Sequence, residues 1–295
     1  MNTVAPRVSV GLPVYNGERF IKEALDSLLT QTFENFELVI SDNGSTDATT
    51  EICNSYAAQD PRIRFYRSEQ NRGGSWNFRR VFDLSTAEYF RWHSYDDLCA
   101  PQLLERCVEV LDRMPSVILC YPRTMVIDEN GQVLQQYTDD LNLRSPSPYQ
   151  RYKHYYHHYR EGAQCNVQYG LMRRSILGQT PLIAPYVNSD INLIGELALR
   201  GEFFEIPENL FLRRDHPAVS MRAFPTARER IVWFDPAKKG HGGHPGWRMF
   251  AEQIRAVKRA PMSWGDRVRC YLLTGRYFTW LAQGSIRNML RGVQT

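Results

Sequence analysis

The sequence predicts an α/β fold in which short strands alternate with helices. Five apolar runs rich in β-branched and aromatic residues occur within the first 122 residues, and the first four are each followed by a helical pattern. Alternation of this kind is typical of a parallel sheet with helices on both faces. The composition agrees, because 43% hydrophobic and 23% charged residues are typical of a globular chain and exclude a disordered or collagen-like one.

The expected elements follow one another in a regular order. Strands are expected at residues 8–12, 36–42, 62–67, 88–94 and 117–121. Helices are expected at residues 18–31, 46–58, from 75 onward and at 101–113. Ligands of such sheets bind beyond the carboxyl ends of the strands, so the segments that follow these strands are the predicted site.

The pattern changes after Pro122. A hairpin is expected to turn at residues 129–131, and residues 139–165 are polar, aromatic and loop-rich. A helix at about 190–200 and strands near 203–206 and 209–212 are expected next. From Ala223 onward the pattern is helical.

Several features bear on the location of the protein. No apolar run approaches the ~18 residues that a membrane span needs, and the first residues lack the layout of a signal peptide. The six cysteines are scattered and form no C-x-x-C pair, so reduced and mostly buried thiols are expected. These observations predict a cytoplasmic protein.

Positive charge is concentrated at the C-terminal end. The net charge is +4, but residues 235–295 carry eleven Lys and Arg against three Asp and Glu, or +8, which leaves −4 for the rest. Basic residues such as Arg287 and Arg291 alternate there with aromatic ones, a pattern that favours helices lying on an anionic membrane surface at its inner face. Nucleic acid is not expected, because no nucleic-acid motif accompanies them. Packing on the domain itself, or on a second subunit of a homodimer, is the alternative.

Polar segments follow four of the expected strands, at residues 13–18, 42–47, 71–77 and 94–97. Each alone is explained equally well by a turn or a helix cap. Together they indicate a nucleotide-binding site, because a carboxylate after the second strand is well placed to accept a hydrogen bond from a ribose or a base edge. Paired carboxylates after the fourth suit a divalent cation that also binds phosphate, and an arginine between them can neutralise a pyrophosphate. Neither G-x-G-x-x-G nor a P-loop is present, so a dinucleotide fold and a P-loop NTPase are not supported.

The segment VSVGLPVYNGERFIKEALDSLLTQTFENFELVISDNGSTD, followed by NRGGSWNF and SYDDLCAP, resembles the family 2 glycosyltransferases of the GT-A fold. The resemblance covers roughly residues 6–220. It implies an α/β fold with one Rossmann-like nucleotide-binding domain, a mixed sheet and a helical C-terminal extension. The implied parts are a nucleotide-sugar-binding half (1–122), an acceptor-binding and catalytic half (123–234) and a basic extension (235–295).

The resemblance also implies a chemistry. Such enzymes transfer a sugar with inversion from a nucleotide-diphosphate donor, usually with Mg²⁺ or Mn²⁺. Asp190 falls at the position of the catalytic base, and Asp97 and His216 fall at positions expected to bind the metal. The residues expected to bind the donor are Pro13, Val14, Tyr15, Asn16, Glu18, Asp42, Asn71, Arg72, Gly73, Asn77, Tyr95, Asp96 and Arg213. Two departures are visible: Ser94 replaces the first carboxylate of the usual Asp-x-Asp-Asp motif, and Ser189 replaces the usual Glu before the base.

Alternatives remain open at this point. Asp190 suits a helix cap, and His216 suits the ordering of a loop. The His and Tyr residues of 152–159 predict a half-buried amphipathic helix on the acceptor side, with a metal face as the rarer alternative. The leading function is a metal-dependent hexosyltransferase that moves a sugar from a UDP- or dTDP-sugar to a glycan or lipid-linked acceptor in surface polysaccharide synthesis. The alternatives are a nucleotidyltransferase or sugar-nucleotide hydrolase, and a non-catalytic nucleotide- or glycan-binding protein.

Overall fold

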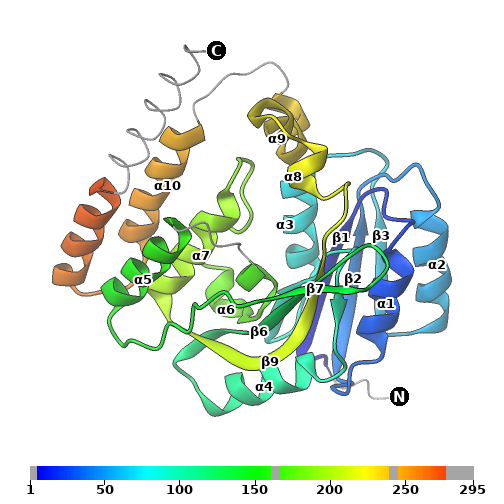
Figure 1. Cartoon of the computed structure of the whole chain (residues 1–295), viewed down its shortest axis with the longest axis horizontal. Coiled ribbons are helices and arrows are strands. Elements are labelled where there is room, and N and C mark those ends of the chain that lie inside the picture. The colour runs from blue at the N-terminus through cyan, green and yellow to red at the C-terminus, as the bar shows by residue number, and fades with distance from the viewer. Residues whose placement is uncertain (1–4, 161–165, 239–244, 277–295) are drawn as a thin grey trace.

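The computed structural model describes residues 5–160, 166–238 and 245–276. Its centre is a mixed sheet of nine strands in the order β3-β2-β1-β4-β8-β6-β9-β5, with β7 paired to β6 (Figure 1). The strands are β1 (Val8–Val14), β2 (Phe36–Asp42), β3 (Ile63–Arg67), β4 (Tyr89–Trp92), β5 (Leu98–Cys99), β6 (Val117–Ile127), β7 (Val133–Tyr137), β8 (Leu171–Arg173) and β9 (Glu202–Arg214). The predicted α/β class with a mixed sheet is confirmed.

The N-terminal half is the parallel part of the sheet. β1 pairs in parallel with β2 and β4, and β2 pairs in parallel with β3. Every residue of β1 and β2 is buried, as expected for strands covered on both faces. The covering helices are α1 (Ile21–Leu29), α2 (Thr49–Gln59), α3 (Gly74–Leu84) and α4 (Leu103–Arg113). Val14 lies opposite Asp42, and Asp42 lies opposite Arg67, so the three strands end together and bring their loops to one edge.

The second half of the sheet is partly antiparallel. β8 joins β4 and β6 antiparallel, while β6 and β9 pair in parallel. The predicted hairpin is confirmed as β6–β7, and its turn places Gly131 at φ 81°, in the left-handed region. β6 crosses the boundary expected at residues 122 and 123, so the two expected halves share one sheet.

One sequence-based expectation was wrong in this region. The strands expected at 203–206 and 209–212 are one continuous strand, β9. Its register with β6 shifts between Ile206, which pairs with Pro122, and Asn209, which pairs with Arg123. A bulge accommodates Pro207 within the strand. The stretch expected to be loop-rich contains α5 (Pro148–Arg160), as its His and Tyr spacing had separately indicated.

Helix α5 is amphipathic, as expected. Tyr152, Tyr155 and Tyr156 are buried, and the Tyr155 hydroxyl donates to the carbonyl oxygen of Ile191 (2.8 Å). Ile191 belongs to α7, so these tyrosines attach α5 to that helix. The remaining elements of this part are η1 (Asn166–Tyr169), α6 (Arg174–Leu177) and α7 (Ser189–Arg200).

The C-terminal part is helical, as expected. It contains α8 (Ser220–Ala223), α9 (Ala227–Phe234), η2 (Pro236–Lys238), α10 (Pro245–Arg259) and a further helical stretch at residues 264–276. Arg259 of α10 forms an ion pair with buried Glu196 of α7 (2.7 Å), and Tyr152 and Thr274 share a buried hydrogen bond. The described part of the extension therefore packs on α5 and α7 of its own chain.

Some expectations fall outside the described residues, among them those for Arg287, Arg291 and Cys165. The other five cysteines are buried free thiols, as expected. Within the described ranges, every helix is too short or too polar to span a bilayer.

Candidate active site

The loops after β1 and β2 are bound to each other. The Asn16 backbone N–H donates to Ser45 Oγ (2.9 Å), and Asn16 Oδ1 accepts from the Thr46 N–H (2.9 Å). Glu18 and Asp47 form a similar exchange, because the Glu18 N–H donates to Asp47 and the Glu18 carboxylate accepts from the Ala48 N–H. Asn16 and Glu18, both expected to contact the donor, thus already order the mouth of the crevice.

Asp42 is fully buried at the end of β2. Its Oδ1 accepts from the Ser45 N–H (2.9 Å), and its Oδ2 accepts from Thr50 Oγ1 (2.6 Å). Arg67 Nε lies 3.7 Å from Oδ2. Both oxygens therefore hold the turn between β2 and α2, and a ribose or base would have to use their remaining lone pairs.

The loop after β3 is attached to the loop after β2 by Asn43. Asn43 Nδ2 donates to Asn71 Oδ1 (3.0 Å) and to the Gly73 carbonyl (3.2 Å), and Asn43 Oδ1 accepts from the Arg72 N–H (3.0 Å). Buried Asn77 donates to the carbonyls of Val14 and Ser41, which ties α3 to the ends of β1 and β2. The expected donor residues of this loop are therefore brought to the same edge as those of the first two loops.

Helix α9 covers the start of α3. Ser75 Oγ donates to the Phe234 carbonyl (2.8 Å). Gly73 is at φ 92°, and a Cβ added there would lie 2.6 Å from the same carbonyl. Glycine is needed at this position for both reasons. The Arg72 guanidinium lies over the Trp76 ring, 5.1 Å from its centroid, and Arg72 remains exposed to solvent.

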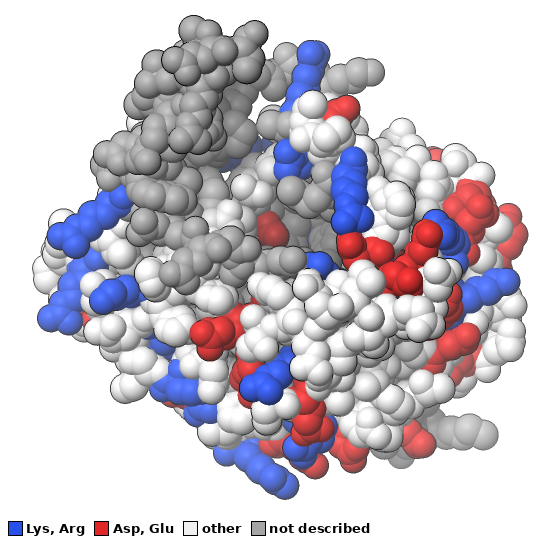
Figure 2. Space-filling view, in the orientation of Figure 1, with Lys and Arg blue, Asp and Glu red and all other residues white. Residues whose placement is uncertain are grey.

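The acidic motif is joined to the end of β9. His216 Nε2 lies 3.0 Å from Asp96 Oδ2, and Asp97 Oδ1 accepts from the Arg214 N–H (2.9 Å). Ser94 Oγ donates to Asp96 Oδ1, so the serine that replaces the usual carboxylate positions its neighbour. Residues about 120 positions apart thereby form one cluster. Figure 2 shows acidic and basic side chains close together in the upper middle of the face, near α8 and α9.

Arg214 organises this cluster, although the sequence analysis did not select it. It is almost completely buried, donates to the backbone carbonyl of Asp96 (2.9 Å) and pairs with Glu23 of α1 (2.7 Å). Its guanidinium lies 4.7 Å from the Phe20 ring centroid. Its place beside Arg213, which the family resemblance assigns to donor binding, was the available signal.

Burial raises the pKa of Asp97 well above its usual range, and the charge of Asp96 adds to the effect. The Arg214 backbone N–H and the charges of Arg213 and Arg91 oppose it. A bound cation would relieve the repulsion between the two carboxylates. The cluster is thus electrostatically suited to positive charge.

Asp190 lies in the first turn of α7. Asn188 occupies the N-cap position, so Asp190 is not the cap residue. Burial raises its pKa, and the backbone N–H groups of Ile191 and of Asp190 itself oppose that shift. The Tyr169 phenol has its pKa raised by burial and then by the charges of Asp97, Asp96 and Asp190. Tyr169 therefore lies within electrostatic reach of both the acidic motif and the expected base.

A second buried acid lies near Arg213. Asp139 is 1% exposed, and among the described residues both of its carboxylate oxygens are buried without a hydrogen-bond partner. Burial and the charge of Glu205 raise its pKa to about 8, while Arg213 lowers it. Arg213 itself donates to Asn166 Oδ1 at 3.4 Å. No motif in the sequence distinguished Asp139 from the polar residues around it.

The residues present fit a weak divalent site. Within the described ranges, no three His, Cys, Asp or Glu side chains are arranged as a ready metal cage. His216 Nε2 nevertheless contacts Asp96, and the adjacent Asp97 accepts from the Arg214 backbone N–H. Among the described residues, His216 Nδ1 is buried without a hydrogen-bond partner. Two carboxylates suit Mg²⁺ or Mn²⁺ when phosphate oxygens complete the coordination.

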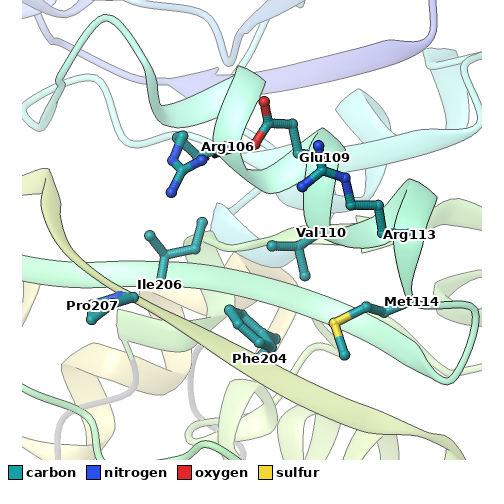
Figure 3. A pocket seen from close by; sticks show the side chains of 8 residues that line it. All are labelled: Arg106, Glu109, Val110, Arg113, Met114, Phe204, Ile206 and Pro207. Atoms are coloured by element: carbon teal, nitrogen blue, oxygen red, sulfur yellow. Dashed lines mark hydrogen bonds and ion pairs between the residues drawn. The ribbon is translucent and has the colours of Figure 1, made fainter.

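A cavity elsewhere does not compete for this role. A hollow of about 260 Å³ lies between α4 and β9, with Arg106, Glu109 and Phe204 among its lining (Figure 3). None of the predicted site residues lines it. The loops after β1 to β4, with the acidic motif attached to the end of β9, are the candidate active site.

The mixed sheet, with the acidic motif at its strand ends, has the GT-A fold. The sequence model of glycosyl transferase family 2 matches residues 9–179, which is more than half of the chain. The protein belongs to glycosyl transferase family 2. Members of this family generally depend on a divalent metal.

Individual relatives agree with the family. An uncharacterized glycosyltransferase of Rickettsia typhi is 34% identical over 134 residues, 45% of this chain and 41% of the relative. The putative glycosyltransferase EpsE of Bacillus subtilis is 32% identical over 127 residues, 43% of this chain and 46% of the relative. The chain thus spans less than half the length of these curated relatives.

Among solved structures, the fold is similar to that of S. aureus TarS (residues 1–349) in complex with UDP-GlcNAc. The TM-score is 0.63 at 15% identity, and the match covers 88% of this chain and 69% of that one. The same TarS fragment in complex with UDP gives a TM-score of 0.62 at 16% identity. At this identity the likeness establishes the fold.

Proposed function

We propose that the protein is an inverting hexosyltransferase that moves a sugar from a UDP- or dTDP-sugar to a glycan or lipid-linked acceptor, in the synthesis of a surface polysaccharide. The observation that carries the proposal is the attachment of the acidic motif to the end of β9, where His216 contacts Asp96 and the Arg214 backbone N–H donates to Asp97. Family membership supports sugar transfer, and the complexes of TarS with UDP and UDP-GlcNAc support a uridine donor.

The donor binds in the crevice. The loops that begin at Pro13, Asp42 and Asn71 surround the nucleoside, and exposed Tyr15 and Arg72 are available to the base and the diphosphate. Tyr95 packs on Gly17, where a Cβ would lie 2.7 Å from its ring. The ring therefore forms one wall of the crevice.

Asp190 acts as the general base. The acceptor hydroxyl attacks the anomeric carbon on the face opposite the diphosphate, and Asp190 takes its proton as the new glycosidic bond forms. The bond from the anomeric carbon to the diphosphate oxygen breaks in the same displacement, so the configuration inverts. A raised pKa suits this role, because it makes the carboxylate more basic.

The leaving diphosphate is stabilised by positive charge. Arg213 is placed to donate to its oxygens, and Asp96, Asp97 and His216 would hold Mg²⁺ or Mn²⁺ against them. The cation supplies Lewis-acid neutralisation of the leaving group. The lack of a ready cage within the described ranges predicts that metal binds tightly only together with the nucleotide.

Product analysis tests this proposal. The full chain is first screened against a panel of nucleotide sugars by thermal shift, with and without Mn²⁺, and stabilisers are then incubated with candidate acceptors. Glycoside and nucleoside diphosphate in equal amounts support the proposal. Nucleoside diphosphate and free sugar without glycoside would indicate a hydrolase, and nucleoside monophosphate would indicate a different bond cleavage.

One observation favours a second candidate, a protein that binds nucleotide sugar without turnover. Ser94 occupies the place of a carboxylate and donates to Asp96, which reduces the negative charge available to a metal. Donor binding with no turnover toward any acceptor, with or without Mn²⁺, would support this candidate.

We also propose that the protein is cytoplasmic and contacts an anionic membrane through its basic extension. The arginines of the 264–276 stretch support this contact. A homodimer formed through the same extension is the competing arrangement, and light scattering with and without vesicles separates the two.

A further inference from the structure

A second, larger cavity is lined by residues that follow the acidic motif in the sequence, from Asn142 to Arg276. It has a volume of about 670 Å³ and lies between the segment at 142–145, helix α5 and the helical stretch 264–276. Its described lining is mostly polar and basic, and contains no Asp or Glu. The lining residues are Asn142, Leu143, Arg144, Ser145, Gln150, Arg151, Lys153, His154, Tyr156, His157, Leu273 and Arg276.

Two arginines of the cavity have different partners. Arg144 pairs with Glu202 (2.8 Å). Buried Arg151 donates to the backbone carbonyls of Ser145, Ala198 and Leu199, and within the described part of the chain none of its hydrogen-bond acceptors is a carboxylate. Burial lowers its pKa, and the charges of Glu202 and Asp266 oppose that effect.

The exposed cations complete the lining. Lys153 and Arg276 are exposed at the cavity, and His154 and His157 are exposed beside Lys153. Figure 2 shows Lys and Arg side chains gathered along the left edge, where Figure 1 places α5 and residues 264–276. The cavity is therefore an electropositive hollow at the surface.

An apolar stripe runs beside it. Trp264 is 77% exposed, Val268 40% and Leu272 63%, and all three belong to the 264–276 stretch. Their spacing of four residues places them on one face of the helix, and Arg276 follows at the same spacing. Buried Cys270 and Thr274 lie on the opposite side, against the domain. The exposed face of this helix therefore carries three apolar side chains and, one turn further on, Arg276 of the cavity lining.

We propose that this cavity binds the phosphate groups of anionic lipids, while Trp264, Val268 and Leu272 enter the headgroup region of the same bilayer. The inference rests on the proposed membrane contact and assigns it to particular residues, including Lys153 from the middle of the chain. Cationic side chains next to exposed tryptophan and leucine match an interface that is anionic outside and apolar below. A soluble phosphate would use the cations but leave the apolar stripe in water.

The extension is better tested by point variants than by deletion. Tyr152 bonds to Thr274, and Arg267 donates to the carbonyls of Lys258 and Ala260, so a truncated chain would lose packing as well as charge. The full chain is therefore assayed by flotation with vesicles of equal parts phosphatidylcholine and phosphatidylglycerol. Pure phosphatidylcholine vesicles serve as the neutral comparison.

The first variant neutralises the cavity. Lys153→Gln with Arg276→Gln removes two charges, each worth about five-fold in partitioning, so vesicle affinity should fall roughly 25-fold. The matched control is Lys22→Gln with Arg113→Gln, which removes two exposed charges on α1 and α4. The control should retain wild-type affinity.

The second variant removes the apolar stripe. Trp264→Ala with Leu272→Ala should lower vesicle affinity on a similar scale, roughly ten-fold or more, because both side chains are expected to leave water on binding. Trp247→Ala with Leu134→Ala is the matched control, since these residues are 61% and 56% exposed on α10 and β7. Calorimetric titration with UDP in every variant reports the donor site separately.

The outcomes separate this inference from the proposed function. Loss of vesicle binding in both test variants with unchanged UDP affinity supports it. Failure of the wild type to bind anionic vesicles overturns it, and so does wild-type binding by the cavity variant. Phosphate-dependent stabilisation of the wild type without vesicle binding would assign the cavity to a soluble phosphate instead. Vesicle binding without UDP binding would leave the inference standing and contradict the proposed function.

Discussion

Replacing Asp190 by Asn tests whether this carboxylate takes the proton of the acceptor. The change keeps the size of the side chain and its capacity to accept the backbone N–H of Ile191, but it removes the basic lone pair. Turnover should fall by about 10²- to 10⁴-fold, the range for a general base. That loss corresponds to about 3 to 5 kcal/mol of activation free energy. Affinity for the donor should remain near that of the wild type.

The structure also predicts the effect of this variant on stability. Burial raises the pKa of Asp190, so the ionised form is held in α7 at a cost that Asn removes. The lost attraction between a carboxylate and the helix N-terminus is worth ~0.3–1 kcal/mol in the other direction. The free energy of unfolding should therefore change by no more than about 1 kcal/mol, and lost turnover would not reflect unfolding.

The pH dependence supplies a further readout. A base must be deprotonated, and the pKa of Asp190 is raised, so wild-type turnover should rise with pH through that pKa. This limb should disappear from the residual activity of Asp190→Asn. Release of nucleoside diphosphate is measured with acceptor present, and Asp83→Asn, at an exposed position of α3, is the control. Normal turnover in Asp190→Asn would refute the reasoning and leave Asp190 a purely structural residue of the first turn.

Three other predictions follow from the contacts of the site. Arg214→Ala should lower the free energy of unfolding by about 3 kcal/mol in urea titration, because it removes a buried partner of Glu23 and of the Asp96 carbonyl; an effect below about 1 kcal/mol would contradict this. Asp42→Ala should cost stability and also UDP affinity by ~1–3 kcal/mol, whereas Thr50→Ala should cost stability alone; equal UDP affinity in both variants would remove Asp42 from the donor site. Asp139 has its pKa raised to about 8, so its stabilising contribution is full below its usual range near pH 4 and is lost as the pH rises toward 8. Asp139→Asn should therefore become more stable relative to the wild type between those pH values in denaturant titrations, and a constant difference would show that Asp139 is ionised in the folded protein.

Much of the fold could be predicted from the sequence because its signals are local. The strand expected at 36–42 matches β2, and α3, α4 and α7 begin within about two residues of expectation. Hydrophobic periodicity and turn residues act over a few positions, and they are readable without knowledge of the partner elements. The same holds for the loops after β1 to β4, since the carboxyl ends of parallel strands necessarily meet.

The partners of the site residues could not be predicted in this way. The sequence indicated Asp42 as a donor ligand, yet the structure uses both of its oxygens in the turn to α2. It indicated Asp96 and His216 separately, whereas their 3.0 Å contact depends on how β9 returns across the sheet. β9 was expected as two strands, and only its pairing with β6 shows that it continues through residues 207 and 208.

The sequence by itself determined the class of the protein, because the strand–helix alternation and the segments from residue 8 to 97 are local patterns. The tertiary structure decided which charges face each other: Arg214 with Glu23 and the acidic motif, and Lys153 with Arg276 at the basic cavity. The physical reason is that electrostatic energy depends on distance and burial in space. Residues that are far apart along the chain come close together and become buried only when the sheet and its helices have packed.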